Sequence, residues 1–250
     1  MKNLTIIIQA RTGSTRMPNK MIIPFAGNKT ILEIIVERLK LTDTRIIIAT
    51  TNNKVDDALV KIIDNLNVDY FRGSENDVLN RFIKCAEYFN CENIIRVCAD
   101  NPFLNLDAIL ELINVAYQNE SDYIGFIVNK KPSIKTHFGF WAEFVTLDIL
   151  KKISYYTTDL IYHEHVTNYI YEHPEFFNIK WINTSPTING REDIRLTIDT
   201  EDDFLNGKLF YNLLYKSEKN NITLDNLINL LDENPFYLEV MKKEILKNSK

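Results

Sequence analysis

Residues 8–20 read Ile-Gln-Ala-Arg-Thr-Gly-Ser-Thr-Arg-Met-Pro-Asn-Lys and directly follow the apolar run Leu4–Ile8. The apolar run predicts a buried first strand that opens into a glycine-containing loop. The loop carries three basic side chains, Arg11, Arg16 and Lys20. Such a loop can surround an anion with cations and backbone N–H groups, as phosphate-binding loops do.

Positive charge is concentrated here against the trend of the whole chain. The formal net charge is -5 at pH 7, yet residues 1–32 contain five Lys or Arg and no Asp or Glu. This contrast favours a local anionic ligand over a general preference for polyanions. The loop matches neither the Walker A nor the dinucleotide-binding pattern. A basic, solvated turn between a strand and a helix is the alternative interpretation.

Length and composition indicate a folded globular protein. The chain has 250 residues, of which 45% are hydrophobic and seven are glycine, so it can bury a full core. No apolar run approaches the ~20 residues of a membrane span, and the N-terminus has no signal-peptide pattern. We therefore expect a soluble, cytoplasmic protein with no membrane partner.

The cysteines and the overall charge argue against two classes of function. Cys85, Cys91 and Cys98 are odd in number and form no Cys-x-x-Cys pair, so we expect reduced thiols and no zinc site. The sequence pI of about 5.5 and the absence of a basic stripe argue against nucleic acid as a partner.

Short β-branched runs alternate with amphipathic patterns in the first half of the chain. The predicted strands are Leu4–Ile8, Arg45–Thr50, Val68–Phe71, Asn93–Cys98 and Asp122–Ile127. The predicted helices are Ile31–Leu41, which follows a capping box at Thr30–Glu33, Val55–Asn65, Asn76–Phe89 and Leu106–Gln118. This alternation predicts an α/β fold with a mostly parallel sheet flanked by helices. In such sheets, ligands bind beyond the carboxyl ends of strands, where the basic loop lies.

The alternation ends near residue 128. We expect a loop at 129–137, further strands at Phe138–Val145, Phe176–Ile182 and Arg195–Ile198, and part of a helix at His163–His173. The last third predicts helices at Glu201–Tyr215, Leu224–Leu231 and Tyr237–Leu246. Without repeats or low-complexity linkers, we expect a single domain over residues 1–250 with an irregular excursion at about 129–192.

Two acids follow predicted strands. Asp100 ends Ile94–Asp100, and Asp199 ends Arg195–Asp199. If both strands are central, the two carboxylates converge on the edge that carries the basic loop, where they can hold Mg²⁺. Each acid has an alternative role as a cap: Asp199 for the acidic helix that follows, and Asp100 for the turn at Pro102.

Two further segments are rich in polar groups. Arg72 and Asp77 follow the third predicted strand; Arg72 can contact phosphates or a base, and Asp77 can instead cap the next helix. Residues 162–169 include His163, His165 and Thr167, which suit a small polar ligand or a solvated helix face.

The motifs together resemble a known family. Residues 10–20 are similar to the Ala-Arg-x-Gly-Ser-x-Arg-x-Pro-x-Lys signature of cytidylyltransferases that make CMP-activated acidic sugars, which include the CMP-Kdo and CMP-sialic acid synthetases. The pattern is most similar to the SpsF-like branch of spore coat polysaccharide biosynthesis. Four later segments follow in the family's order: 72–81, 100–102, 164–167 and 199–203.

The resemblance implies a Rossmann-like nucleotide-diphospho-sugar transferase fold with a dimerisation-type excursion, CTP as donor, Mg²⁺ and a homodimer. It implies a nucleotide site formed by Ala10, Arg11, Gly13, Ser14, Arg16, Lys20, Arg72 and Asp77. It implies catalytic roles for Arg11, Lys20, Asp100 and Asp199, with the two aspartates on the metal. It implies an acceptor site that includes Glu143, His163, His165 and Thr167.

Two segments depart from the family's patterns. The SpsF-like Gly-Leu-Asp-x-Glu is replaced by Gly139-Phe-Trp-Ala-Glu143. The Gln-Gly-Asp-Glu-Pro of CMP-Kdo synthetases is replaced by Cys98-Ala-Asp-Asn-Pro102, which does not favour Kdo itself as the acceptor.

The resemblance implies that an acceptor oxygen attacks the α-phosphorus of CTP and that pyrophosphate leaves. The expected acceptor is an acidic nonulosonic or octulosonic sugar in surface polysaccharide or glycan biosynthesis. A sugar phosphate or a phosphonate is an alternative acceptor. A glycosyltransferase of the GT-A type and a non-catalytic nucleotide-binding subunit are the alternative functions.

Overall fold

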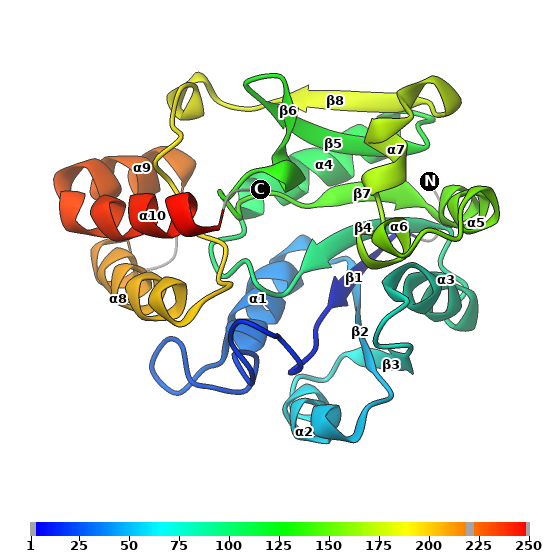
Figure 1. Cartoon of the computed structure of the whole chain (residues 1–250), viewed down its shortest axis with the longest axis horizontal. Helices are drawn as coiled ribbons and strands as arrows, with labels where there is room; N and C mark the ends of the chain where they lie inside the picture. The colour runs from blue at the N-terminus through cyan, green and yellow to red at the C-terminus, as the bar shows by residue number, and fades with distance from the viewer. Residues whose placement is uncertain (1–3, 219–222, 249–250) are drawn as a thin grey trace.

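A mixed eight-stranded sheet forms the centre of the computed structural model, which describes residues 4–218 and 223–248 (Figure 1). The strands are β1 (Leu4–Gln9), β2 (Arg45–Thr51), β3 (Asp69–Gly73), β4 (Asn93–Cys98), β5 (Tyr123–Val128), β6 (Lys131–Pro132), β7 (Glu143–Thr146) and β8 (Ile179–Asn183). Their order is β3-β2-β1-β4-β7-β5-β6, and β8 pairs with β5. Strands β1 to β4 pair in parallel, whereas β7 runs antiparallel to both β4 and β5. The predicted α/β class is confirmed.

Strand β1 lies between β2 and β4. In register, Ile6–Ile8 faces Ile46–Ile48 on one side and Ile95–Val97 on the other. These segments, which are apolar apart from Arg96, are buried on both faces, as is usual for parallel strands covered by helices. The basic loop that follows β1 therefore leaves the sheet at the middle of its carboxyl edge.

Helices cover both faces of the sheet (Figure 1). They are α1 (Ile31–Leu39), α2 (Asp57–Asp64), α3 (Val78–Tyr88), α4 (Leu106–Gln118), α5 (Leu147–Tyr156), α6 (Leu160–Glu164), α7 (Asn168–Glu172), α8 (Glu201–Glu218), α9 (Leu224–Glu233) and α10 (Pro235–Lys247). One apolar core joins Ile6 and Ile8 to α1, α2, α4 and α8 to α10. The other core joins Ile7 to α3, α5 and α7. The Thr30–Glu33 capping box predicted for α1 is present.

Two predicted strands in the second half are wrong in whole or in part. Of Phe138–Val145, only the portion from Glu143 onward pairs in the sheet as β7. Gly139 has a φ of +68°, and a Cβ there would lie 3.2 Å from the Leu196 backbone. The chain therefore bends at Gly139, whereas the prediction had an extended strand there.

The segment Arg195–Ile198 forms no strand in the part of the chain that the structure describes. Its amide groups bond to two loops instead: Leu196 and Thr197 donate to the His137 carbonyl, and Ile198 donates to the Asp100 carbonyl. These bonds hold the segment beside the end of β4 without a ladder. Asp199 therefore reaches the carboxyl edge by loop contacts, for a different reason from the predicted one.

Other boundaries in the second half also differ from the predictions. The expected loop at 129–137 contains β6, and the expected helix at His163–His173 is divided into α6 and α7. Strand β8 starts at Ile179, because Pro174–Phe176 forms a short 3₁₀ turn. Helix α5 was not predicted. None of the helices in the described ranges has both the length and the apolar character that a membrane span requires.

His163 connects α6 to α3. Its Nδ1 lies 2.9 Å from Asp77 Oδ1, and its Nε2 lies 3.0 Å from the Thr157 carbonyl oxygen. Both partners only accept hydrogen bonds, so both ring nitrogens need a proton and the imidazolium is favoured. Burial lowers the pKa of His163, but these two bonds outweigh it, and the pKa is raised above 6.5.

We expect this pair to make stability depend on pH. A raised pKa means that the pair contributes fully below about pH 6.5 and loses its contribution as pH rises through the folded-state pKa. His163→Gln should therefore lower the free energy of unfolding by about 0.5–1 kcal/mol at pH 5.5, and by less at pH 8.5. Urea denaturation at both pH values measures this difference.

Asp77→Asn is the matched control for this pair. Asp77 also caps α3, since its side chain accepts from the Asn80 amide. Asparagine keeps the cap and removes the charge. In the Asp77→Asn background the Thr157 bond remains, so the effect of His163→Gln should depend less on pH than in the wild type. An undiminished pH dependence there would contradict the role of Asp77.

Candidate active site

A cavity of about 920 Å³ opens at the carboxyl ends of β1 and β4. Its wall is formed by the basic loop, the turn after β4, the segments around β6 and Trp141, and residues 164–171. The lining residues predicted from the sequence are Ala10, Arg11, Ser14, Arg16, Lys20, Asp100, Asp199, His165 and Thr167. Segments up to about 190 residues apart in the chain thus meet in one place.

The basic loop is anchored below the cavity by a buried carboxylate. The backbone amide and the hydroxyl of Thr12 both donate to Asp56 Oδ1 at 2.6 Å, and the Thr51 hydroxyl donates to the other oxygen. Gly13 packs against Glu75, because a Cβ there would lie 2.8 Å from the Glu75 carboxylate. The loop is thereby tied to the ends of β2 and β3, which orients its cations before any ligand arrives.

Asp100 and Asp199 converge on Lys20, as the sequence predicted. The Lys20 ammonium lies 4.0 Å from Asp100 Oδ2 and 3.9 Å from Asp199 Oδ1, and it donates to the Ile198 carbonyl at 2.5 Å. The Lys20 side chain is almost buried, whereas Asp100 is one-third exposed toward the cavity. Two carboxylates and a lysine therefore share one end of the cavity.

The capping alternative for Asp199 does not hold in this structure. Thr200 Oγ1 accepts from the Asp203 amide, and Asp203 Oδ2 accepts from the Thr200 amide, so these two residues form the cap of α8. The cap of α4, which follows Asp100, is Asn105. Neither Asp100 nor Asp199 is occupied as a helix cap.

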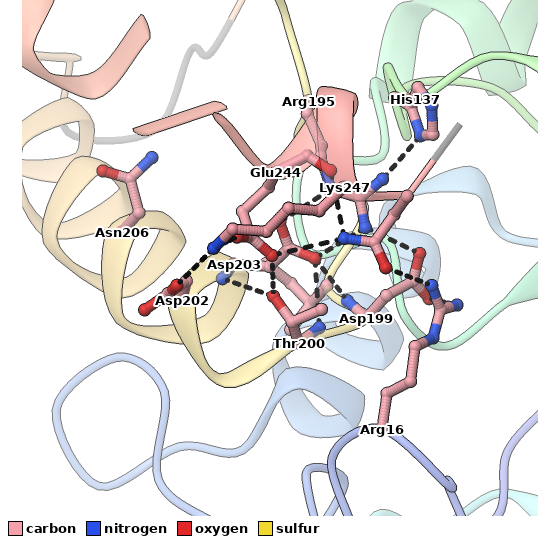
Figure 2. Close-up of polar contacts among 12 residues, drawn as sticks. Arg16, His137, Arg195, Asp199, Thr200, Asp202, Asp203, Asn206, Glu244 and Lys247 are labelled. Carbon is pink, nitrogen blue, oxygen red and sulfur yellow. Dashed lines mark hydrogen bonds and ion pairs between the residues drawn. The ribbon is translucent and has the colours of Figure 1, made fainter. Parts of the chain in front are cut away.

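Arg195 donates a hydrogen bond to Asp199 and holds it in place (Figure 2). Its fully buried guanidinium contacts both oxygens of Asp203 at 2.7 and 2.8 Å and Asp199 Oδ2 at 3.2 Å. Its Nη1 lies 2.6 Å from His137 Nδ1. Burial lowers the pKa of Arg195, but the two carboxylates outweigh it and raise the pKa, so the cation is retained. Arg195 thus binds Asp199 through Oδ2, while Asp199 Oδ1 faces Arg16 and Lys20.

The last turn of α10 also reaches this end of the cavity (Figure 2). Glu244 is buried and accepts from the Thr200 hydroxyl at 2.7 Å. Arg16 lies between Asp199 Oδ1, at 3.2 Å, and Asn248 Oδ1, at 3.3 Å. The roles of Glu244 and Asn248 could not be found from sequence patterns, because their contacts join distant segments of the chain.

A second buried network lies beside the cavity. Arg96 and Glu143 form an ion pair at 2.6 Å with almost no exposure, and Tyr123 and Thr167 also donate to Glu143. Burial lowers the pKa of Arg96, but Cys98 and Glu143 outweigh it and raise the pKa. Burial, together with the Glu143 carboxylate, raises the pKa of Tyr123. Arg96 and Thr167 line the cavity and Glu143 does not, so Glu143 orients these two side chains.

Five of the predicted site residues do not line the cavity in this structure: Gly13, Arg72, Asp77, Glu143 and His163. Arg72 donates to two carbonyl groups, those of Thr51 and Asn53, and pairs with Asp57 at 2.7 Å. Its guanidinium therefore stabilises the loop after β2. Asp77 and His163 pair with each other, as described above.

Arg81 is a cavity residue that the sequence analysis did not single out. It is 1% exposed and lines the cavity from α3, one turn after Val78. It ends the 72–81 motif, and an arginine on the apolar face of a predicted helix is the signal that could have found it.

One cysteine also lies in the cavity wall. Cys98 is partly exposed there, whereas Cys85 and Cys91 are buried. Burial raises the pKa of the Cys85 thiol to about 12.

The donor set fits a divalent cation that also binds phosphate. Among the residues that the structure describes, no group of three or more His, Cys, Asp or Glu side chains could hold a metal alone. Asp100 and Asp199 supply two carboxylates, and Mg²⁺ commonly takes one or two carboxylates and completes its shell with phosphate oxygens and water.

Comparison with known proteins agrees with this chemistry. The cytidylyltransferase family profile matches residues 5–242. An uncharacterized protein of Methanocaldococcus jannaschii is 39% identical over 92% of this chain and 90% of its own. The spore coat polysaccharide biosynthesis protein SpsF of Bacillus subtilis is 33% identical over 94% of this chain and 96% of its own.

Solved structures show the same fold. A cytidylyltransferase from Leptospira borgpetersenii superposes with a TM-score of 0.84 at 26% identity, covering 95% of this chain and 97% of that one. A CMP-2-keto-3-deoxy-manno-octonic acid synthetase solved with CTP superposes with a TM-score of 0.65 at 13% identity, covering 85% and 99%. The chain belongs to the cytidylyltransferase family and is a CTP-dependent nucleotidyltransferase.

Proposed function

We propose that this enzyme transfers CMP from CTP to an acidic sugar of the nonulosonic or octulosonic type and releases pyrophosphate. The product would serve surface polysaccharide or glycan biosynthesis. The observation that carries the proposal is that the cavity is basic on two sides. Arg11, Arg16 and Lys20 lie on the side of β1, and Lys131 and Lys135 lie on the side of β6. Two separate anions, a triphosphate and an acidic acceptor, match this distribution.

The β6 side suits a hydroxylated anion. Lys131 and Lys135 are exposed side chains of the cavity wall, and Ser133, Thr136 and His165 add hydrogen-bonding groups nearby. Lys135 is oriented by Glu172 at 3.0 Å and by the Tyr171 ring, 4.8 Å from its centroid. An anionic acceptor would gain a charge interaction with these two lysines that a neutral acceptor would not. A sugar phosphate or a phosphonate would satisfy them too, so the acceptor panel below includes both.

On the β1 side, the loop cations bind the triphosphate of CTP. Arg11 donates to the Glu75 carbonyl at 3.3 Å, which fixes its direction, while half of the Arg16 side chain is exposed. When pyrophosphate leaves, negative charge develops on its bridging oxygen. Cations held in advance at that position stabilise the transition state without reorganisation.

Asp100 and Asp199 would hold Mg²⁺. When bound, the metal supplies a positive charge that neutralises phosphate oxygens and favours ionisation of an acceptor hydroxyl. Lys20 keeps the two carboxylates at one end of the cavity, and Arg195 fixes the direction of Asp199.

The proposed reaction is a single displacement. An acceptor oxygen forms a bond to the α-phosphorus of CTP, and the bond from that phosphorus to the oxygen bridging to the β-phosphorus breaks. Pyrophosphate leaves with the bonding electron pair, and the acceptor proton passes to solvent. The residues of this chain mainly position the reactants and neutralise charge, as in other phosphoryl transfers.

We also propose that the enzyme is a homodimer that associates through the excursion. Five large apolar side chains on and around α5, α6 and the turn at 174–176 are at least half exposed: Tyr155, Tyr156, Leu160, Ile161 and Phe176. Tyr156 contacts the rings of both Tyr155 and Phe176, so these three side chains form one patch, and Leu160 and Ile161 follow on α6. Exposed apolar patches of this kind mark protein interfaces.

The central prediction concerns pyrophosphate release. With Mg²⁺ and CTP, we expect release to require an acidic sugar and to stop when EDTA removes the metal. UTP, GTP and ATP are the control nucleotides, and neutral sugars, sugar phosphates and phosphonates are the control acceptors. Release with a sugar phosphate alone would overturn the acidic-sugar acceptor and leave the nucleotidyltransferase in place.

The two carboxylates can be tested separately from the fold. Asp100→Asn and Asp199→Asn should each lower the rate of pyrophosphate release by about 10²–10³-fold or more, because each removes a charged group from the reacting centre. Asp202→Asn is the matched control, since Asp202 is exposed and pairs only loosely with Lys247, at 3.6 Å. Its rate should stay within about twofold of the wild type, and full activity in both test variants would disprove the metal assignment.

The dimer can be tested by sedimentation equilibrium. Leu160→Asp places a charge in the apolar patch, and this charge would be costly to bury in an interface. The variant should be monomeric at concentrations at which the wild type is dimeric. Leu246→Asp, at an exposed leucine of α10 outside the patch, should leave the dimer intact. A monomeric wild type would contradict the proposal.

A further inference from the structure

Arg81 is a buried cation at the cavity whose charge the protein does not neutralise directly. Its Nη1 donates to the Ser74 carbonyl at 2.6 Å, and its Nε has no hydrogen-bond partner. The Asp56 and Glu75 carboxylates attract this guanidinium, but neither forms an ion pair with it in the part of the chain that the structure describes. Burial, followed by repulsion from Arg11, lowers the pKa of Arg81 to about 10, and Asp56 and Glu75 offset only part of this effect. A charged group in this condition is costly unless something else pairs with it.

The surrounding chain is shaped to hold Arg81 in this place. A Cβ at Gly73 would lie 2.9 Å from Cγ of Arg81, so the end of β3 carries glycine where the arginine stem passes. Val78, on the preceding turn of α3, lies in the same cavity wall and gives it an apolar surface. The chain therefore holds Arg81 at a defined position in the cavity wall, where its donors suit a ligand group with hydrogen-bond acceptors.

Arg81 lies on the α3 side of the cavity, close enough to Arg11 of the basic loop for its pKa to be lowered, and on the side away from Asp199 and the end of α10. Arg81 belongs to α3, which packs on the sheet face of Ile7. Arg16, Lys20 and Asp199 contact α10 and the segment before α8, which pack on the other face. Figure 1 shows α3 and the group α8 to α10 on opposite sides of the sheet. If the triphosphate lies at Arg16 and Lys20, the α3 side of the cavity, where Arg81 lies, is left for the nucleoside.

We propose that Arg81 selects the nucleobase of the donor, by donating hydrogen bonds to the adjacent O2 and N3 acceptors of cytosine. This inference rests on the proposed function, because it assigns a residue to the donor nucleotide. A guanidinium presents donors side by side in one plane and matches two neighbouring acceptors. Uracil carries a hydrogen on N3, so one donor of Arg81 would face another donor. The same arginine thus favours CTP and rejects UTP.

A nucleobase fits this position better than a phosphate. A phosphate carries full charge and requires several donors, whereas a flat neutral ring can rest on Val78 and satisfy one deep guanidinium. Arg72, which the motif comparison placed near the nucleotide, is held by Thr51, Asn53 and Asp57 and lies outside the cavity wall. Arg81 is the arginine of the 72–81 motif that lines the cavity.

Calorimetric titration of the full chain with CTP, UTP and pyrophosphate, in Mg²⁺ and without an acceptor, tests this assignment. We expect the wild type to bind CTP about 10- to 100-fold more tightly than UTP, the range of one good bidentate contact. Arg81→Met should bring the two dissociation constants within about threefold of each other, because CTP binding weakens while UTP binding stays the same or becomes tighter; pyrophosphate binding should not change. Arg81→Lys should behave in the same way, since an ammonium keeps the charge but lacks the planar pair of donors.

Arg45→Met is the control for the loss of an arginine in the same half of the chain. Arg45 pairs with Asp69 and the Phe89 carbonyl at the opposite edge of the sheet, and its replacement should leave the ratio of the two constants unchanged. Thermal unfolding curves show whether each variant folds. If Arg81→Met does not fold, the comparison of CTP and UTP is made with Arg81→Lys. Equal weakening of CTP and UTP, or restoration of the CTP preference by lysine, would overturn the inference. A wild type that binds no nucleotide would instead overturn the proposed function.

Discussion

The guanidinium of Arg195 lies fully buried between Asp203 and Asp199, and the geometry of the end of the cavity proposed to bind Mg²⁺ depends on it. Removing a charge from water costs several kcal/mol, so a buried ion pair is retained only when each partner is well bonded. Here Asp203 bonds to Arg195 and also to two backbone amides at the start of α8. Since residues 195–198 belong to no strand in the described chain, these side-chain bonds act together with the backbone bonds to His137 and Asp100 in fixing where Asp199 lies.

Charge balance follows from the same arrangement. Arg16 and Lys20 contact Asp199, and Lys20 also approaches Asp100. In the proposed complex the same cations would turn to the triphosphate and the same carboxylates to Mg²⁺. The four groups therefore have charged partners both before and after the ligands bind. Such a cluster can be kept partly buried, and partly buried charges interact more strongly than fully solvated ones.

The first half of the fold could be predicted because local patterns decide it. Leu4–Ile8 and Asn93–Cys98 are short runs dominated by apolar β-branched residues, and such runs are typical of the buried strands of a parallel sheet. The second half depends on distant partners. Phe138–Val145 has the composition of a strand, but Gly139 packs against Leu196, and no local pattern reveals this contact.

The site was predictable to a similar extent. The basic loop and the acids at 100 and 199 could be found because their residue types are informative and the carboxyl edge of a parallel sheet collects them. Motif spacing does not show which side chain of a turn faces inward. Arg72 was therefore expected at the nucleotide and Arg81 was overlooked, although both belong to one motif. Helix α5 could have been found from Thr146, which caps it.

Cys98 is a natural chemical probe for ligand binding in the cavity. Cys85 and Cys91 are enclosed by the core, and only Cys98 meets the space that a substrate would fill. A small alkylating reagent should therefore modify one position in the native protein, and a bound ligand that covers this position should slow the modification. Occupancy of the cavity can then be followed by mass spectrometry, with no radioactive nucleotide and no knowledge of the acceptor.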